Sequence, residues 1–318
     1  MGDERRIRFG CFYRTLPMMA AERLGFYRRH GLEVDHQRVA SSTQQFEFLR
    51  DGRYDAVQTS PDNVANYRYN GDNPLGERID VQGFMGMDYG LYLVLAARPE
   101  IGSAGDLRGR AVAVDALESG FAYVLYEILA RAGLHRGEDY SVVSVGGVSH
   151  RFERLLAGDP SFEATLLSGG FETRAANAGY KLFGSAHDIA DPYVGAWGAA
   201  TRDWLTERAD DATAFVGAYR EATEWCFAPE NRQACLELLM ETADTPRELA
   251  EQLYEIQLRE RVGNVPDAGI VADGVRNVLA LRAQFGGFEE EPDLDAMLTA
   301  GALYDTRFLS GAGSAAQV

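Results

Sequence analysis

The chain has 318 residues, 46% of them hydrophobic, which is enough to bury a large core and favours two lobes over one compact unit. Its 48 acidic and 31 basic residues give a formal net charge of -17 without a basic cluster, which argues against nucleic acid or an anionic membrane surface as a partner. The three cysteines, Cys11, Cys226 and Cys235, lack CxxC spacing and argue against a disulfide framework or a thiolate zinc site.

The amino-terminal sequence MGDERRIRFGCFY reaches a strand-like run within about six residues. That leaves no room for the apolar segment of a secretory signal, so the chain as written is expected to be cytoplasmic. A chain from which a leader had been removed would read the same way, and it would be periplasmic or extracellular.

Strand-type runs alternate with helix-type stretches in the first half of the chain. Strands are predicted at 6–13, 32–40 and 55–60, and helices at 17–31, 43–52 and 61–70. This alternation is typical of βαβ units on a mainly parallel sheet. Gly31 suits the position after a helix, and Ser41, Ser42 and Thr43 offer capping oxygens to the helix that follows.

A long extended stretch at 81–97 is followed by a turn-rich segment, and the alternation then restarts with a strand at 111–116 and a helix at 120–134. The restart predicts a second lobe. A strand at 193–201 is expected to return to the first lobe, and the chain after Arg202 reads as helix. Two crossings of this kind form a hinge that lets one lobe close on the other. The expected limits are 1–94 and 195–318 for lobe 1, and 95–194 for lobe 2.

The opening strand and a series of later segments carry a family resemblance through their order and spacing. These segments are AAERLGFYRRHGLEVD, FLRDGRYDAVQTSPDNV, GSAGDLRGRAVAV, LARAGL, RFERLLAGDPSFEATLLSG, AGYKLFGS and LYDTRFL. Over nearly its whole length the chain resembles the solute-binding proteins for nitrate, sulfonates, taurine and the thiamine pyrimidine precursor.

That resemblance implies the type II periplasmic-binding fold. The fold class is α/β, with two lobes of mainly parallel sheets flanked by helices, a two-strand hinge, a helical carboxyl-terminal tail and a ligand cleft between the lobes. The implied function is to bind a small organic anion or heteroaromatic compound, such as a sulfonate, carboxylate or pyrimidine, for an ABC permease.

The same fold resembles a few cytoplasmic enzymes: a pyrimidine synthase of thiamine biosynthesis, menaquinone-pathway enzymes, a dihydroxyphthalate decarboxylase and the sulfinate desulfinase of dibenzothiophene breakdown. The desulfinase uses a cysteine near its first strand, and this chain has Cys11 there. The alternative function is therefore a desulfinase, decarboxylase or hydrolase with Cys11 as nucleophile. Arg14 is the nearest cation that could favour its thiolate, and a buried, unreactive cysteine is the competing interpretation.

In open α/β sheets, ligands gather beyond the carboxyl ends of the strands, where helix starts present free N–H groups. This rule selects loops in both lobes and at the hinge, where Asp88, Gly147 and Gly170 also lie. The candidate ligand-binding residues are Tyr13, Arg14, Ser41, Ser42, Thr43, Ser60, Asp62, Asn63, Tyr89, Glu118, Ser119, Gly146, Ser168, Gly169, Tyr193 and Trp197.

Ordinary structural roles compete with ligand binding for these residues. The hydroxyls at 41–43 could hold a carboxylate, sulfonate or phosphate group or only cap a helix, and Arg14 could pair with an anion or lie in solvent. Ser60 reads first as a cap, and Asp62 either stabilises the helix start or faces a cationic ligand. The aromatic candidates could sandwich a planar ligand or pack in the core.

The five histidines lack the spacing of a metal site, so neither a metal nor a cofactor is predicted. The absence of a histidine-rich iron cluster gives the pyrimidine-synthase reading no support. His150 follows a glycine pair in a predicted cleft loop, and it is the histidine that could act as an acid, a base or a ligand donor. Plain surface exposure is its alternative.

Overall fold

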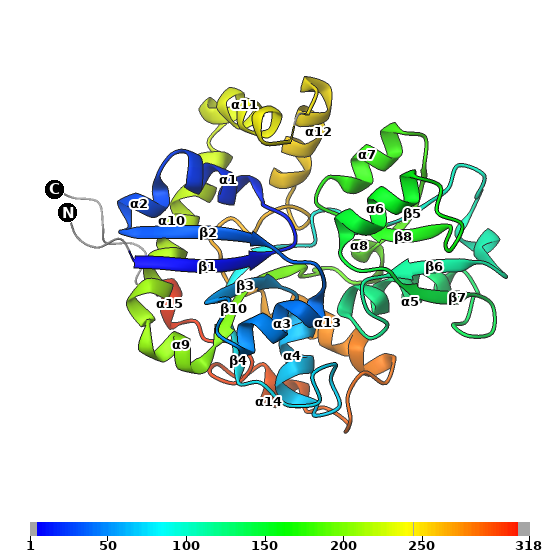
Figure 1. Ribbon diagram of the computed structural model, residues 1–318, viewed down its shortest axis with the longest axis horizontal. Coiled ribbons are helices and arrows are strands. Elements are labelled where there is room, and N and C mark those ends of the chain that lie inside the picture. The colour runs from blue at the N-terminus through cyan, green and yellow to red at the C-terminus, as the bar shows by residue number, and fades with distance from the viewer. Residues whose placement is uncertain (1–4, 244, 311–318) are drawn as a thin grey trace.

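The computed structural model describes residues 5–243 and 245–310, and it contains two five-stranded sheets side by side, the first on the left of Figure 1 and the second on the right. The first sheet has the order β2-β1-β3-β10-β4. Its strands are β1 (Arg5–Cys11), β2 (Leu32–Arg38), β3 (Ala56–Thr59), β4 (Val81–Asp88) and β10 (Ala196–Thr201). Strand β10 is antiparallel to both neighbours, and β1 pairs parallel with β2 and β3.

The second sheet repeats this plan with the order β7-β6-β8-β5-β9. Its strands are β5 (Val94–Ala97), β6 (Ala111–Val114), β7 (Ser141–Ser144), β8 (Ala164–Leu167) and β9 (Lys181–Ser185). Strand β5 is antiparallel to β8 and β9, whereas β6 is parallel to β7 and β8. The expected α/β fold of mainly parallel sheets is confirmed, with one antiparallel strand in each sheet.

Helices flank both sheets. The first half contains α1 (Leu16–Arg23), α2 (Phe26–Arg29), α3 (Ser42–Arg50), α4 (Pro61–Tyr69), η1 (Ala104–Leu107), α5 (Gly120–Arg131) and α6 (Val148–Leu156). The second half contains α7 (Phe171–Asn177), α8 (Ala186–Ile189), α9 (Arg202–Glu207), α10 (Ala209–Phe227), η2 (Pro229–Asn231), α11 (Arg232–Ala243), α12 (Arg247–Leu258), α13 (Ala272–Gln284), α14 (Leu294–Met297) and α15 (Arg307–Ser310). Within the described residues, no helix combines the length and apolar character needed to cross a membrane.

Two predicted elements are broken where the backbone turns left-handed. The helix expected at 17–31 is divided into α1 and α2 because Gly25 adopts a φ of 76°, which only glycine takes up without strain. The single extended stretch expected at 81–97 is divided into β4 and β5, because Leu91 and Tyr92 have φ values of 46° and 60°. The second break is where the chain leaves the first sheet for the second.

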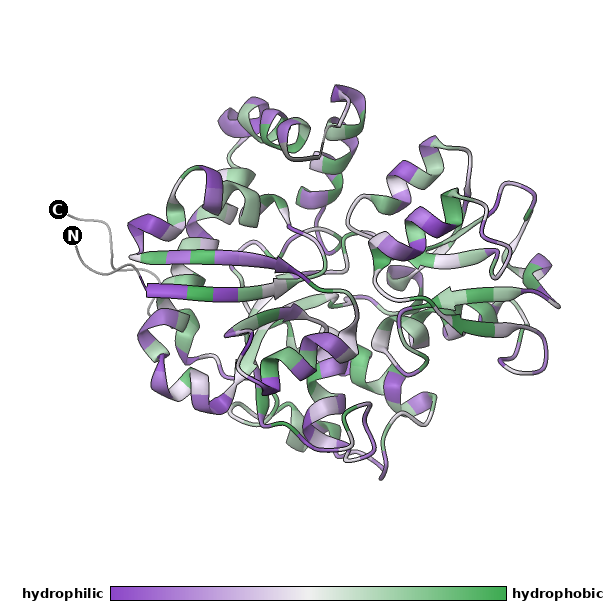
Figure 2. Ribbon diagram, in the orientation of Figure 1, coloured by the Kyte–Doolittle hydropathy of each residue, from purple (hydrophilic) through white to green (hydrophobic). Residues whose placement is uncertain are grey.

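Figure 2 shows hydrophobic residues in the strands of both sheets, alternating with hydrophilic ones along β1 and β2. All eight residues of β4 and all four of β8 are buried, which is the pattern of strands covered by helices on both faces. Helix α13 joins the two cores, since Val275 packs with the hydrophobic cluster of the first sheet and Val278 with that of the second. Helix α13 therefore packs against both lobes and connects them in addition to the two crossings.

The two crossing segments touch through glycines. Gly90 has a φ of 94°, and a Cβ atom on Gly195 would lie 2.2 Å from the Cα atom of Gly90. Real Cβ atoms do not approach a backbone atom so closely, so both positions need the smallest residue for the crossings to run side by side.

We expect Gly195→Ala to lower the free energy of unfolding by about 1–3 kcal/mol, because the added methyl group forces the crossings apart. Urea denaturation measures the change. Gly105→Ala is the matched control, since the Cβ there meets nothing closer than the Ser103 hydroxyl at 3.6 Å. Equal stability of Gly195→Ala and the unaltered protein would contradict this account of the crossing.

Candidate functional site

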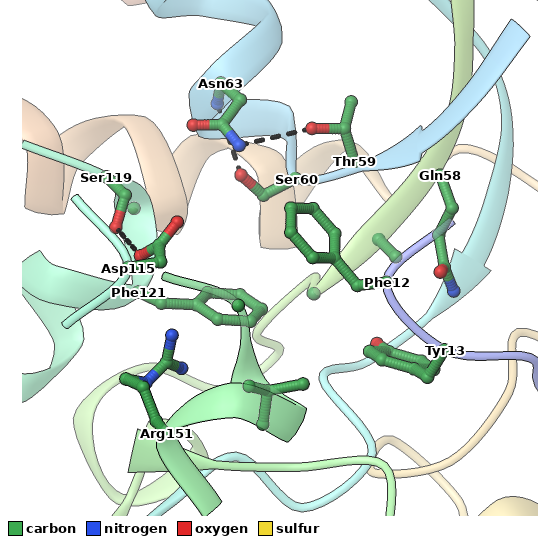
Figure 3. Close-up of a pocket in the computed structure, with 15 residues that line it drawn as sticks. Phe12, Tyr13, Gln58, Thr59, Ser60, Asn63, Asp115, Ser119, Phe121 and Arg151 are labelled. Carbon is green, nitrogen blue, oxygen red and sulfur yellow. Dashed lines mark hydrogen bonds between the residues drawn. The ribbon is translucent and has the colours of Figure 1, made fainter. Parts of the chain in front are cut away.

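A small cavity lies between the lobes at the carboxyl ends of the strands, and we call it the interlobe cavity. It encloses about 50 Å³, which suits a ligand of a few heavy atoms. Figure 3 shows its wall. The lining residues are Phe12, Tyr13, Gln58, Thr59, Ser60, Asn63, Asp115, Ser119, Gly120, Phe121, Gly147, Val148, Arg151, Gly195 and Ala196.

The lobe 1 side of the cavity is built on the start of α4. Ser60 caps this helix, since its Oγ accepts a hydrogen bond from the backbone N of Asn63 at 3.2 Å, and Pro61 occupies the first helical position. The Asn63 amide nitrogen in turn donates to Thr59 Oγ1 at 3.2 Å. Local helix-capping chemistry thus holds hydroxyl and amide groups at the cavity wall before any ligand arrives.

The lobe 2 side begins with Ser119 at the start of α5. Its Oγ accepts from the backbone N of Ala122 at 3.3 Å and donates to Oδ1 of Asp115 at 2.6 Å. The other oxygen of Asp115 accepts from the Ser42 hydroxyl of lobe 1 at 3.1 Å. A carboxylate in the cavity wall is therefore held by one hydroxyl from each lobe.

Arg151 on α6 brings a buried cation to the cavity. The residue is 2% exposed, and its guanidinium donates to Thr165 Oγ1 at 2.9 Å and to the carbonyl oxygens of Leu166 and Gly146. All three acceptors are neutral, and across the described ranges Arg151 forms no ion pair with a carboxylate. Burial lowers the pKa of Arg151, and the charge of Asp115 raises it. A cation buried in this way calls for an anion.

Gln58 on β3 is a second buried polar side chain in the cavity wall. It is 1% exposed, and neither its amide nitrogen nor its amide oxygen has a hydrogen-bond partner in the part of the chain that the structure describes. Several other buried side chains share this state, but Gln58 is one that lines the cavity, where a ligand or a water molecule can complete its hydrogen bonds.

Aromatic rings close the rest of the wall. Phe12 and Tyr13 come from the loop after β1, and Phe121 comes from the first turn of α5 (Figure 3). Tyr13 donates through its hydroxyl to Oδ2 of Asp88 at 3.2 Å, and burial raises the pKa of Asp88 to about 6. The rings give an apolar enclosure around the polar groups, which strengthens each hydrogen bond made inside.

The structure brings four candidate residues from the sequence to the cavity, namely Tyr13, Ser60, Asn63 and Ser119. Ser42 reaches it through its hydrogen bond with Asp115. Ser41 instead caps α3 through the backbone N of Gln44, and Thr43 makes a side-chain hydrogen bond with Tyr67. The hydroxyl cluster at 41–43 is thus divided between capping and the approach to the cavity.

The other candidates do not line the cavity. Tyr193 and Trp197 are fully buried in the cores of lobe 2 and lobe 1, because their rings fill space beneath the strands. Glu118 and His150 are exposed, and Tyr89 is half-buried near the crossing. Asp62 forms a buried ion pair with Arg282, 3.3 Å apart.

The glycine candidates, Gly146 and the turn at 168–170, make contacts with other parts of the protein. The carbonyl oxygen of Gly146 accepts a hydrogen bond from Arg151, so Gly146 contacts a residue of the cavity wall without lining the cavity itself. In the Ser168–Gly170 turn, Gly169 packs on the Tyr13 ring, and the N–H of Gly170 donates to the Glu172 carboxyl at 2.9 Å. The Gly170 N–H is therefore already hydrogen-bonded to the Glu172 carboxyl and is not available to an anionic ligand.

The geometry around Cys11 does not resemble an activated nucleophile. The residue is 4% exposed, and burial raises the pKa of its thiol to about 12, with Arg14 lowering the pKa and Glu22 raising it. Arg14 is engaged with Glu22 at 2.6 Å. Cys226 and Cys235 are fully buried in the lobe 1 core.

Gln58, Asp115 and Arg151 were not among the candidates from the sequence. Asp115 directly follows the strand Ala111–Val114, and the prediction missed it because the strand was expected to continue to residue 116. Gln58 lies in the short strand AVQT, whose four residues are all buried although two of them, Gln58 and Thr59, are polar. Arg151 gave no signal, because an arginine in the middle of SHRFERLL reads as the solvent face of an amphipathic helix.

Comparison with known proteins points to one fold. Residues 24–177 match the family model described as "ABC transporter, phosphonate, periplasmic substrate-binding protein". No curated protein matches the sequence significantly.

Three solved structures share the arrangement of the chain. The periplasmic nitrate-binding protein of Synechocystis PCC 6803 superposes with a TM-score of 0.78 at 14% identity, over 93% of this chain and 85% of that one. The alkanesulfonate-binding protein of Xanthomonas axonopodis pv. citri bound to MOPS superposes with a TM-score of 0.72 at 14% identity, over 92% of this chain and 96% of that one. The periplasmic aliphatic sulphonate-binding protein of Escherichia coli superposes with a TM-score of 0.63 at 17% identity, over 92% of this chain and 91% of that one.

We expect the thiol of Cys11 to react slowly in the native protein, because the buried side chain with a pKa of about 12 stays protonated at neutral pH. Ellman's reagent at pH 7.5 measures the rate, and the same assay in guanidinium chloride gives the total of three free cysteines. Rapid release of one equivalent in the native state, lost in Cys11→Ser, would contradict the expectation.

Glu172 makes stability depend on pH. Burial raises the pKa of its carboxyl from 4.5 to about 7, so between these values the native protein binds more protons than the unfolded chain. The free energy of unfolding should therefore fall as the pH rises from 5 to 8, and Glu172→Gln should reduce that fall. Urea titrations at both pH values measure it, with exposed Glu207→Gln as the control; an unchanged pH dependence in Glu172→Gln would argue against this role.

Proposed function

Because this chain has the fold of the type II periplasmic-binding proteins, we propose that it is the solute-binding component of an ABC importer and that it closes on a small organic anion. The proposal assigns the interlobe cavity as the binding site. It also assigns the protein to the outer side of the cytoplasmic membrane, since an importer receives its solute there.

The observation that carries the proposal is the state of Arg151. The guanidinium is 2% exposed, donates to three neutral acceptors and contacts no carboxylate within the described residues. The carboxylate whose charge acts on it, Asp115, accepts from Ser42 and Ser119 instead. Burying such a charge costs several kcal/mol unless an anion accompanies it. An oxyanion of the ligand supplies that charge, and it can accept the remaining N–H groups of the guanidinium.

Helix starts add to the attraction. Helices α4, α5 and α6 all begin at the cavity, at Ser60, Ser119 and Gly147. The first turn of a helix has unpaired N–H groups and a partial positive charge, so an anion is favoured near it. Three such starts around one small space support an anionic ligand over a neutral one.

The matched family model and the named structural neighbours agree with this chemistry. Their names describe binding of phosphonate, nitrate and alkanesulfonate, all of which are oxyanions. The enzyme alternative has no comparable support, because the thiol of Cys11 is buried and has a pKa of about 12. The transport proposal requires that the bound compound be recovered unaltered, and turnover would contradict it.

We expect a panel of small phosphonates, sulfonates and carboxylates to contain at least one compound that raises the melting temperature of the protein. Replacing Arg151 by Lys, which keeps the charge but loses the planar fork, should weaken binding of that compound by roughly tenfold or more. Isothermal titration calorimetry measures the affinity.

Arg154→Lys is the matched control, because Arg154 lies on the same helix but pairs with Asp159 at the surface. It should bind the compound like the unaltered protein. Melting curves without ligand establish that both variants are folded. Unchanged affinity in folded Arg151→Lys would refute the assignment of the cavity.

A further inference from the structure

We propose that Cys226 and Cys235 form an intramolecular disulfide when the reduced protein meets a thiol–disulfide oxidant, and that this bond fastens helix α11 to helix α10. The inference concerns a modification site in lobe 1 and does not depend on which ligand enters the interlobe cavity. Only the place where oxidation occurs rests on the proposed function, because the outer side of the cytoplasmic membrane is oxidising whereas the cytoplasm keeps thiols reduced.

Packing brings these two cysteines together. Cys226 lies in the last turn of α10 and Cys235 in the first turn of α11, and η2 turns the chain between them. The Sγ atom of Cys235 lies 3.9 Å from the backbone oxygen of Cys226, and the two thiols hydrogen-bond to each other. A disulfide needs its sulfurs about 2 Å apart, so a small adjustment of the side chains leads from this thiol pair to the bond.

The surroundings accept a disulfide without leaving a buried group unpaired. Both cysteine side chains are 0% exposed in the hydrophobic cluster of lobe 1. Oxidation removes the S–H of Cys235 that donates to the backbone oxygen of Cys226. The hydroxyl of Tyr254 donates to the same oxygen at 3.4 Å, so that oxygen keeps a partner after oxidation.

The reaction is a pair of thiol–disulfide exchanges, written here with oxidised glutathione as the oxidant. The thiolate of one cysteine attacks the glutathione disulfide, which forms a mixed disulfide and releases one glutathione thiolate. The thiolate of the second cysteine then attacks the protein sulfur of the mixed disulfide and releases the other. The S–S bond of the oxidant breaks and that of the protein forms, while two electrons and the two thiol protons pass to glutathione.

The bond would act on helices that contact both lobes. Helix α11 packs against α1 of lobe 1 and against α12, at the top of Figure 1. From α12, the side-chain oxygen of Gln252 accepts from the Asn177 amide of lobe 2 at 3.1 Å, and Leu253 packs on Gly170. A disulfide at the start of α11 would therefore fasten these helices to lobe 1 at one end while α12 contacts lobe 2.

The expected gain in stability is modest because the closed loop is short. The bond joins the ends of a ten-residue segment, 226–235, in a chain of 318 residues. The loss of chain entropy from a loop of this length, in a protein of this size, raises the melting temperature by about 4 °C.

The test refolds the reduced, unaltered protein from guanidinium chloride in a mixture of reduced and oxidised glutathione. After acid quenching and removal of glutathione, the denatured chain should show one thiol with Ellman's reagent in place of three. Its mass should fall by that of two hydrogen atoms, and a peptide map should join Cys226 to Cys235. The melting temperature should exceed that of the protein refolded under reducing conditions.

Cys11→Ser is the matched control, because it removes the third cysteine and leaves the pair intact. It should lose both of its thiols on oxidation and gain the same rise in melting temperature. Cys226→Ala should show no such rise. Circular dichroism establishes that each variant is folded, and the unaltered protein and Cys11→Ser decide the question if Cys226→Ala is not.

Three thiols remaining in the unaltered protein after oxidative refolding would overturn the inference, since the cysteines would then be two small apolar core residues. Pairing through Cys11, or glutathione retained on the chain, would overturn it as well. A bond between Cys226 and Cys235 that lowers the melting temperature would contradict the fit of the two helices. None of these results bears on the proposed function, and a failure of every oxyanion to bind would leave the thiol count unchanged.

Discussion

The buried ion pair between Asp62 and Arg282 joins the parts on which the cavity depends. Both side chains are 0% exposed, and Arg282 donates to Oδ2 of Asp62 at 3.3 Å and to the backbone oxygen of Glu118 at 3.2 Å. The backbone N–H of Gly120 also bonds to the Asp62 carboxyl. Helix α4 of lobe 1, the start of α5 in lobe 2 and helix α13 therefore meet at one carboxyl group. Burial raises the pKa of Asp62 to about 6 despite the opposing effect of Arg282.

The contacts of Asp62 with Arg282 and Gly120, which we call the junction, explain how nearby polar groups remain without hydrogen-bond partners. Because α4 and α5 are held start to start, Ser60, Asn63 and Ser119 face one another across a space that the protein does not fill. The pair at the junction satisfies its own charges, so it contributes no attraction for a ligand. At the cavity wall, Gln58 has an amide without a hydrogen-bond partner among the described residues, and Arg151 has a buried charge without a contacting carboxylate. A ligand that supplied these partners would offset their cost.

The strand-end rule selected residues that line the interlobe cavity because it depends only on chain direction. It found Tyr13, Ser60, Asn63 and Ser119, which follow strands or begin helices. The rule could not rank its candidates, since capping and ligand contact use the same residue types, as Ser41 illustrates. Arg151 shows the other limit: its burial comes from Thr165 and Leu166 on β8, and a contact between distant segments leaves no local pattern in the sequence.

The contacts across the cavity differ in kind from those behind it. In front, the lobes meet through the Ser42 hydroxyl on Asp115, the Gly147 N–H on the backbone oxygen of Ala40 at 3.0 Å, and the exposed Arg38 guanidinium on the Ser149 hydroxyl. Each such bond contributes about 1 kcal/mol net, so few of them must break for the front to open. Behind, the Asp62 and Arg282 pair would leave two buried charges if separated, at several kcal/mol. Under the proposed function, opening would therefore pivot about that pair and the glycine contact of the crossings, and ligand bonds to Arg151 would favour closure.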